Sequence, residues 1–108
     1  MNATYEECLQ ACLDCLEACN VRYNAYLNKD DLKMMASCIR LDRECADACA
    51  LAVKALQFDS PFAAQICQLC ADICEACGKE YEKYKYEHCQ KRAEVCFKCA
   101  EACRKTTA

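Results

Sequence analysis

The 108-residue chain contains one glycine, one proline, one histidine and no tryptophan. So little glycine and proline argues against a small protein stapled by disulfides, because such scaffolds are rich in loops. A single histidine, with no glycine-rich phosphate loop and no recognisable base for a serine or cysteine nucleophile, argues against an enzyme. We therefore expect a regular structure without catalytic activity.

Long apolar runs and a strong charge bias are also missing. The formal net charge is -3, and Lys and Arg are interspersed among Asp and Glu, so no basic stripe points to nucleic acid. No apolar stretch approaches membrane-spanning length, and residues 1–7 lack the basic and apolar segments of a signal peptide. We predict a cytoplasmic protein that binds neither nucleic acid nor a membrane.

Cysteine, by contrast, is abundant: 15 of the 108 residues. Most gaps between neighbouring cysteines are three or four residues, which is the period of one face of an α-helix. An odd count, and the poor geometry for bridging thiols one turn apart on a helix, disfavour a disulfide framework. We expect free thiols along the inner faces of helices, at Cys8, Cys12, Cys15, Cys19, Cys38, Cys45, Cys49, Cys67, Cys70, Cys74, Cys77, Cys89, Cys96, Cys99 and Cys103.

Capping residues in the first half of the chain delimit two helices. A capping box at Thr4–Glu7 predicts a first helix that runs to about Leu27. Asp30, in the polar turn that follows, is expected to cap a second helix that runs to about Gln57.

The second half of the chain predicts two more helices. Ser60 is the expected N-cap of the third, with Pro61 as its first residue. Gly78 either ends that helix or lies inside a helix that reaches about Tyr84, and residues 85–105 form the fourth. Short loops between four helices predict an all-α, antiparallel up-down-up-down four-helix bundle with a Cys-lined interior, as one domain over residues 1–108.

Continuing the same spacing along each helix places all fifteen cysteines inside the bundle, together with Arg22, Asp42 and Arg92. Asp42 and Arg92 fall in adjacent layers, and we expect them to pair if they are buried, because an unpaired buried charge is costly. Antiparallel stacking predicts the layers Cys8/Cys49/Cys67/Cys103, Cys12/Cys45/Cys70/Cys99, Cys15/Asp42/Cys74/Cys96, Cys19/Cys38/Cys77/Arg92 and Arg22/Met35/Tyr81/Cys89.

A core of small thiols buries little apolar area, so something other than protein is expected to fill it. Sites made of thiolates alone select Cu(I), Zn(II) or iron–sulfur clusters. Structural zinc usually uses four ligands on knuckles or loops, whereas thiolates in a continuous interior can be shared between Cu(I) ions. We predict a store of multiple Cu(I) ions. Buffering of zinc or another thiophilic ion, as in a metallothionein, stays open. A thioredoxin-like role for the CxxC pairs is disfavoured, since the strand–helix context is missing.

Residues 7–19, 67–77 and 96–103 carry repeated CxxxC and CxxC spacings on three of the expected helices. These stretches resemble the bacterial copper storage proteins, the Csp family of Cys-lined four-helix bundles. The resemblance implies many Cu(I) ions inside the bundle and a homotetramer, and the absence of a leader resembles the cytosolic branch. A copper chaperone is a candidate partner. Asp42 and Arg92 depart from the cysteine pattern, which leaves the copper count of their layers open.

The two ends of the predicted bundle differ. Leu56, Phe58 and Phe62 are expected to close the all-thiol end near Cys8 with apolar bulk. At the opposite end we predict a copper entrance or auxiliary ligands, because thioether and imidazole groups are workable but weaker Cu(I) ligands than thiolate. Ordinary core packing of the methionines and a solvated histidine are the alternatives. The proposed entrance residues are Met34, Met35, Asp42 and His88.

Overall fold

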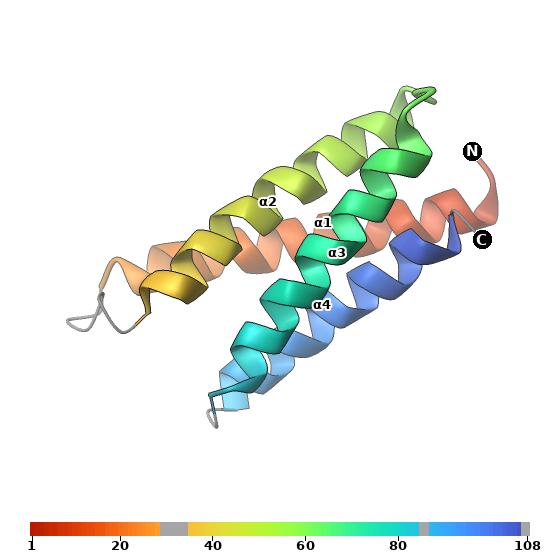
Figure 1. Cartoon of the computed structure of the whole chain (residues 1–108). Helices are drawn as coiled ribbons and strands as arrows, with labels where there is room; N and C mark the ends of the chain where they lie inside the picture. The colour runs from red at the N-terminus through yellow and green to blue at the C-terminus, as the bar shows by residue number, and fades with distance from the viewer. Residues whose placement is uncertain (29–34, 85–86, 107–108) are drawn as a thin grey trace.

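The computed structural model consists of four helices packed side by side (Figure 1). It describes residues 1–28, 35–84 and 87–106, with Glu87 and His88 described by their backbone alone. The helices are α1 (Ala3–Tyr26), α2 (Ala36–Gln57), α3 (Ala63–Glu82) and α4 (Glu87–Lys105). No strand forms within these described ranges.

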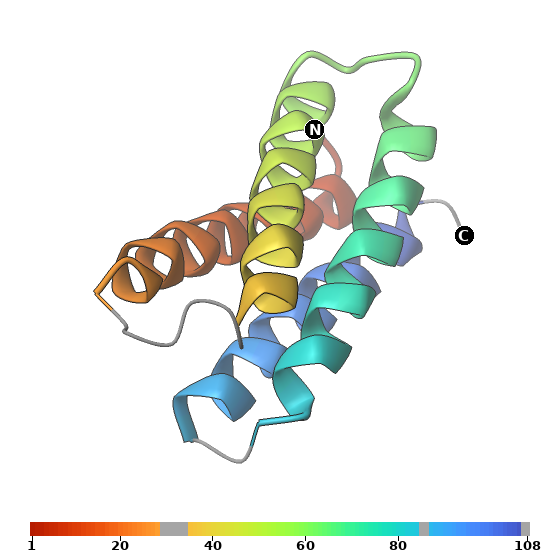
Figure 2. The ribbon, with the colours of Figure 1, turned by 60° about the vertical axis from the view of Figure 1, so that its left-hand side comes forward.

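Each helix packs against the next one in the chain, and α4 closes the bundle by packing against α1. The antiparallel four-helix bundle is therefore confirmed, with extents of 43 × 20 × 17 Å. Figure 2 shows the bundle from a second side. Both chain ends lie at the same end of the bundle, where the Lys105 Nζ is 3.3 Å from the Glu7 Oε1. Within the described helices, none combines the length and apolar character that a membrane span needs.

The start of α1 differs from the prediction. Asn2, not Thr4, is the N-cap, and its side-chain Oδ1 accepts a hydrogen bond of 2.8 Å from the backbone N–H of Tyr5. Asn is at least as good an N-cap as Thr. The helix therefore begins at Ala3, two residues before the start that a Thr4 cap predicts. The second predicted cap, Asp30, lies outside the described residues, and α2 begins at Ala36.

The connection between α2 and α3 also corrects the prediction. The third helix begins at Ala63 rather than Pro61, and Phe62 occupies the N-cap position. Ser60 still contributes its hydroxyl, whose Oγ accepts a hydrogen bond of 3.1 Å from the backbone N–H of Phe62. Asp59 reverses the chain direction with φ 53°, a left-handed conformation that Asp tolerates better than most residues.

This turn directs two aromatic side chains away from the core. Phe58 is 76% exposed and Phe62 is 62% exposed, whereas Leu56 and Ala63 are buried. The prediction that both phenylalanines close the end of the bundle is therefore wrong. Leu56 alone of the three takes an inward position, because the turn places Phe58 after the last helical residue and Phe62 before the first.

Gly78 lies inside α3, which resolves the two alternatives for the end of that helix. A Cβ at this position would lie 2.8 Å from the Phe97 Cε1 on α4, so the glycine permits close contact between the two helices. Phe97 and other partly buried apolar side chains pack around the interior, including Leu9, Leu16, Ile39, Leu41, Val53, Ile66, Ile73 and Val95. These side chains hold the helices together around a core that contains few other large apolar side chains.

Candidate metal centre

All fifteen cysteines are buried, each with at most 3% of its surface exposed, and all are free thiols. The predicted inward placement of every cysteine is therefore confirmed. Buried alanines lie among them and bring the helix backbones close together, as Ala46, Ala52, Ala71, Ala93 and Ala100 do.

Eleven of the fifteen thiols form four closely spaced groups. Within each group, the Sγ atoms all lie within 4.8 Å of one another. The groups are Cys8/Cys67/Cys103, Cys12/Cys70/Cys99/Cys103, Cys15/Cys49/Cys74/Cys99 and Cys15/Cys45/Cys96.

Three shared cysteines join the groups into one continuous column. Cys103 belongs to the first two groups, Cys99 to the second and third, and Cys15 to the third and fourth. Neighbouring Sγ atoms lie from 3.5 Å apart, between Cys8 and Cys103, to 4.0 Å apart, between Cys49 and Cys99. We call the fifteen buried cysteines together the thiol column.

The register of α2 differs from the predicted layers by about one turn. Cys45 was expected beside Cys12 and Cys70, but its Sγ lies 3.5 Å from that of Cys74 and 3.7 Å from that of Cys15. Cys49 was expected beside Cys67, but it lies 3.8 Å from both Cys70 and Cys74. The α2–α3 connection is two residues longer than predicted, because α3 begins at Ala63 rather than Pro61. This difference accounts for the shift of α2 along the column relative to α3.

Burial and contacts between thiols raise the pKa of most thiols of the column, whereas contacts with neighbouring thiols lower the pKa of Cys15, Cys70 and Cys103. Contacts with neighbouring thiols, together with burial, raise the pKa of Cys45 and of Cys49. At the end of the column remote from the chain termini, which we call the polar end, burial raises the pKa of the Cys38 thiol. A metal ion that binds here must therefore displace thiol protons, as binding to thiolate always requires.

Asp42 lies completely buried at the end of the column remote from the chain termini. Its Oδ2 accepts hydrogen bonds from Arg43, of 3.1 Å from Nε and 3.0 Å from Nη2. Its Oδ1 accepts a hydrogen bond of 3.3 Å from the Tyr81 hydroxyl. Burial raises the pKa of Asp42, although the Arg43 hydrogen bonds favour the ionised form and oppose that effect.

The predicted pairing of Asp42 with Arg92 is wrong. Arg92 is half-buried and donates a hydrogen bond of 2.9 Å from Nη1 to the backbone oxygen of Ala18. Arg43, the next residue on α2, donates two hydrogen bonds to the Asp42 carboxylate, and the long side chains of Arg22 and Tyr81 reach its other oxygen, so other partners occupy the carboxylate.

Sequence reasoning missed two residues at this end, Arg43 and Glu80. The Cys38 Sγ donates a weak hydrogen bond of 3.9 Å to the Glu80 Oε1, and the Lys83 Nζ lies 2.8 Å from the Glu80 Oε2. Both residues lie beside an inward position rather than on one, so the spacing that found the cysteines passes over them. Only the length of their side chains, which reach back toward the core, could have indicated their contacts.

The predicted entrance residues are placed in part. Met35 is half-buried and packs against the core, and Asp42 is buried. Met34 lies outside the described residues, as does the side chain of His88. The entrance itself therefore stays a prediction.

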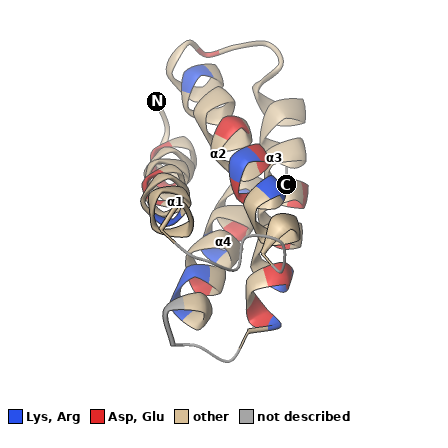
Figure 3. Cartoon of the chain, turned by 90° about the vertical axis from the view of Figure 1, so that its left-hand side faces the viewer, with Lys and Arg blue, Asp and Glu red and all other residues tan. Residues whose placement is uncertain are grey.

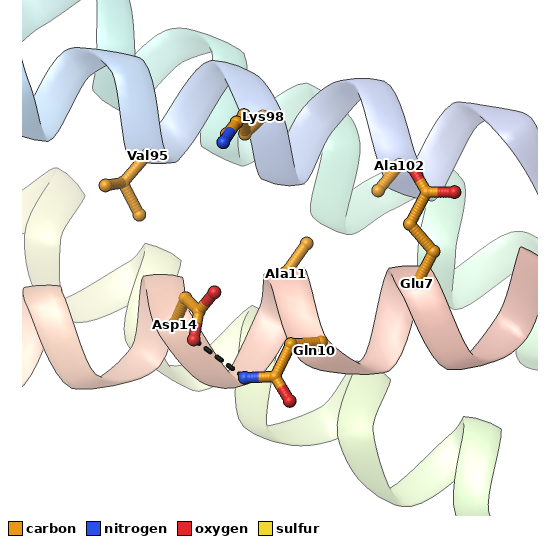
Figure 4. Close-up of a pocket in the computed structure, with 7 residues that line it drawn as sticks. All are labelled: Glu7, Gln10, Ala11, Asp14, Val95, Lys98 and Ala102. Carbon is orange, nitrogen blue, oxygen red and sulfur yellow. Dashed lines mark hydrogen bonds between the residues drawn. The ribbon is translucent and has the colours of Figure 1, made fainter.

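Charged residues of both signs lie along α2, α3 and α4, whereas α1 carries only acidic residues apart from the buried Arg22 (Figure 3). A groove of about 340 Å³ lies between α1 and α4 (Figure 4). Glu7, Asp14, Val95 and Lys98 are among its lining residues, and the Gln10 Nε2 donates a hydrogen bond of 2.8 Å to the Asp14 Oδ1. Because no cysteine lines this groove, it is separate from the thiol column.

Comparison with known proteins identifies close relatives. The sequence matches the family described as copper storage protein over residues 1–108. A cysteine-rich protein of Bacillus subtilis, YhjQ, is 56% identical over 66 residues, which span 61% of this chain and 61% of that protein. The Cu(I)-bound copper storage protein BsCsp3 is 55% identical, with a TM-score of 0.90 over 97% of this chain and 99% of that one. A cytosolic copper storage protein from Streptomyces lividans with five coppers is 32% identical, with a TM-score of 0.88 over 96% and 92% of the two chains.

Proposed function

Because the chain belongs to the copper storage protein family, we propose that it stores multiple Cu(I) ions on the thiolates that line its bundle. The observation that carries this proposal is the continuity of the thiol column. Cys15, Cys99 and Cys103 each belong to two groups, so their thiolates are placed to bridge ions of adjacent groups. Soft thiolates favour Cu(I), and shared thiolates raise the number of ions that a given number of cysteines can hold.

The chemistry of loading follows from the thiol protons that copper displaces. Each Cu(I) ion forms a bond to sulfur where an S–H bond breaks, and the proton leaves for the solvent. We propose all fifteen cysteines as ligands, since every one of them faces the interior. Their burial also limits the access of oxidants, which act on exposed thiolates.

We propose that copper enters at the end of the bundle remote from the chain termini. This end contains the α1–α2 and α3–α4 connections. Met35 and Cys38 lie there, and Glu80 and Tyr84 flank the Cys38 thiol. The proposed entrance or auxiliary residues remain Met34, Met35, Asp42 and His88.

Further proposals concern the location of the protein, its assembly and its source of copper. We propose a single copper-binding domain over residues 1–108, a cytoplasmic location, a homotetramer, no catalytic role and a copper chaperone as candidate donor. The Streptomyces lividans relative is named as cytosolic, which supports the location. Leu51, Phe58, Phe62 and Leu69 are large apolar side chains that lie exposed on α2, on α3 and in the turn between them, and such exposure supports self-association.

Zinc buffering is the second candidate. Two of the thiol groups contain four cysteines, the number that a tetrahedral zinc site uses. Anaerobic titration of the reduced protein with Cu(I) and with Zn(II), each against a chelating competitor, separates the two functions. We expect many equivalents of tightly held Cu(I) and loss of Zn(II) to a modest chelator. Zinc retained under conditions that remove copper would contradict copper storage.

A further inference from the structure

Arg22 is a buried cation at the end of the thiol column. It is 4% exposed, and its guanidinium carbon lies 3.7 Å from the centre of the Tyr81 ring. Its Nε and Nη1 atoms are buried and have no hydrogen-bond partner among the described residues. Burying a guanidinium with unpaired N–H groups is costly, so a site of this kind calls for a compensating anion.

Asp42 does not fully supply that anion. Its nearest oxygen is 4.0 Å from the Arg22 Nη1, beyond hydrogen-bonding distance. The same carboxylate already accepts two hydrogen bonds from Arg43 and one from Tyr81. Two guanidinium groups therefore face one carboxylate, and the half-buried Arg92 adds positive charge at the same end. Among these described side chains, three guanidinium groups and one carboxylate, the balance of charge is positive.

Apart from Asp42, the thiol column is the source of negative charge that the interior offers to Arg22 when copper binds. Arg22 follows Cys19 by one helical turn, and Tyr81, on which it stacks, follows Cys77 by one turn. The Cys15/Cys45/Cys96 group, whose Sγ atoms lie within 4.8 Å of one another, is the thiol group at this end of the column. Thiolates that bind copper would bring negative charge to this end of the column, within reach of the guanidinium.

We propose that Arg22 is the counter-ion of a Cu(I)–thiolate cluster that contains more thiolates than copper ions, formed by the Cys15/Cys45/Cys96 group with Cys19 and Cys77. This inference rests on the proposed function of copper storage. A cluster with equal numbers of Cu(I) and thiolate is neutral, and each additional thiolate adds one negative charge and releases one further proton. A buried anion of this kind is costly in an apolar interior, and a fixed cation beside it lowers that cost.

The inference distinguishes the two ends of the column. At the other end, Arg104 and Lys105, which follow Cys103, form ion pairs with carboxylates on the surface, so the groups around Cys8 and Cys12 favour neutral clusters with one proton released per copper. The Arg22 end favours thiolate-rich clusters, which bind fewer ions and bind each with more thiolates. Arg22 thereby sets the charge, and with it the copper-to-sulfur ratio, of the clusters nearest the proposed entrance.

Native mass spectrometry at isotopic resolution tests this directly, because the mass of each loaded species gives both the copper ions gained and the protons lost. In the parent protein, some partly loaded species should have lost at least one proton more than the copper ions they gained. In Arg22→Met, the two numbers should become equal. Arg22→Lys, which keeps the charge, should restore the excess. Arg40→Met, which removes an exposed arginine from α2, is the matched control and should behave as the parent.

A second readout is the competition of a Cu(I) chelator for the last ions bound. Arg22→Met should bind these ions about tenfold to a hundredfold more weakly, as expected for a lost opposite charge at close range. If Arg22→Met does not fold, Arg22→Gln provides the neutral variant. Equal proton excess in Arg22→Met, Arg22→Lys and the parent would overturn the inference while leaving copper storage intact. A parent protein that takes up no Cu(I) would instead overturn the proposed function.

Discussion

Asp42 is the residue on which the most interactions at the polar end converge. Its carboxylate joins Arg43 and Arg22, and the Tyr81 hydroxyl donates to it from α3. A buried carboxylate with several hydrogen bonds holds its neighbours in place but is costly to disturb.

Replacing Asp42 with Ala should destabilise the apoprotein by about 3–5 kcal/mol, because the buried Arg22 would lose its nearest carboxylate and the buried Tyr81 hydroxyl its acceptor. Chemical denaturation of the reduced, metal-free protein measures this. Asp47→Ala, at an exposed position on the same helix, serves as control and should change the free energy of unfolding by less than about 0.5 kcal/mol. Equal stability of the two variants would show that Asp42 does not hold the polar end together.

Gly78 offers a second test at the scale of one residue. In an open helix, Ala in place of Gly stabilises by about 1 kcal/mol. Here the added methyl would lie 2.8 Å from Phe97, so we expect Gly78→Ala to destabilise by about 1–3 kcal/mol instead. Combining it with Phe97→Leu should recover part of that loss, measured as a double-mutant cycle of unfolding free energies. A gain in stability from Gly78→Ala alone would contradict the close contact between α3 and α4.

At the scale of the helices, the inner faces were predictable and the register was not. The three- and four-residue spacing of Cys67, Cys70, Cys74 and Cys77 defines one face of α3, and the same argument holds for each helix. The relative level of two helices depends on the turn that joins them. Here the left-handed conformation of Asp59 and the late start of α3 decided it, and neither leaves a periodic signal in the sequence.

The unpredicted helix register also explains which parts of the candidate site could be predicted and which could not. The fifteen thiols could be assigned to the interior because burial follows from the face of the helix alone. The interaction of Arg43 with Asp42 could not be predicted, because it depends on the register of the helices and on the length of the side chains. The exposure of Phe58 was missed for a related reason, since hydrophobicity favours burial but the turn geometry decided its direction.

The helices should form without metal, because apolar side chains such as Leu16, Ile73 and Phe97 pack outside the thiol column. Circular dichroism of the reduced, chelated protein should therefore give a strongly helical spectrum. Copper should raise the melting temperature further, because it binds the folded state in preference to the unfolded one. A largely unstructured apoprotein that folds only on adding Cu(I) would contradict this, and would make the bundle resemble a zinc finger in its dependence on metal.

The stability of the whole apoprotein should depend on alkaline pH. Burial raises the pKa of Cys38, and thiol contacts with burial raise those of Cys45 and Cys49, so the folded state retains thiol protons that the unfolded state loses. This contribution is fully present below the unfolded thiol pKa of about 8.5 and is lost as the pH rises above it.

Accordingly, the melting temperature of the reduced apoprotein should fall between about pH 7 and about pH 10.5. The Cu(I)-loaded protein is the matched control, because it contains the same lysines and tyrosines while its thiols have already lost their protons to copper. Its melting temperature should change much less over the same range. A parallel decline in both forms would assign the effect to lysine and tyrosine instead.

The central claim is that one continuous thiol column holds the copper, and anomalous diffraction at the copper absorption edge from Cu(I)-loaded crystals tests it most directly. We expect copper peaks along the interior from the Cys8/Cys67/Cys103 group to the Cys15/Cys45/Cys96 group, with Cys15, Cys99 and Cys103 each bound to more than one ion. Copper confined to the outer surface, or to isolated four-thiolate sites with no shared cysteine, would contradict the account.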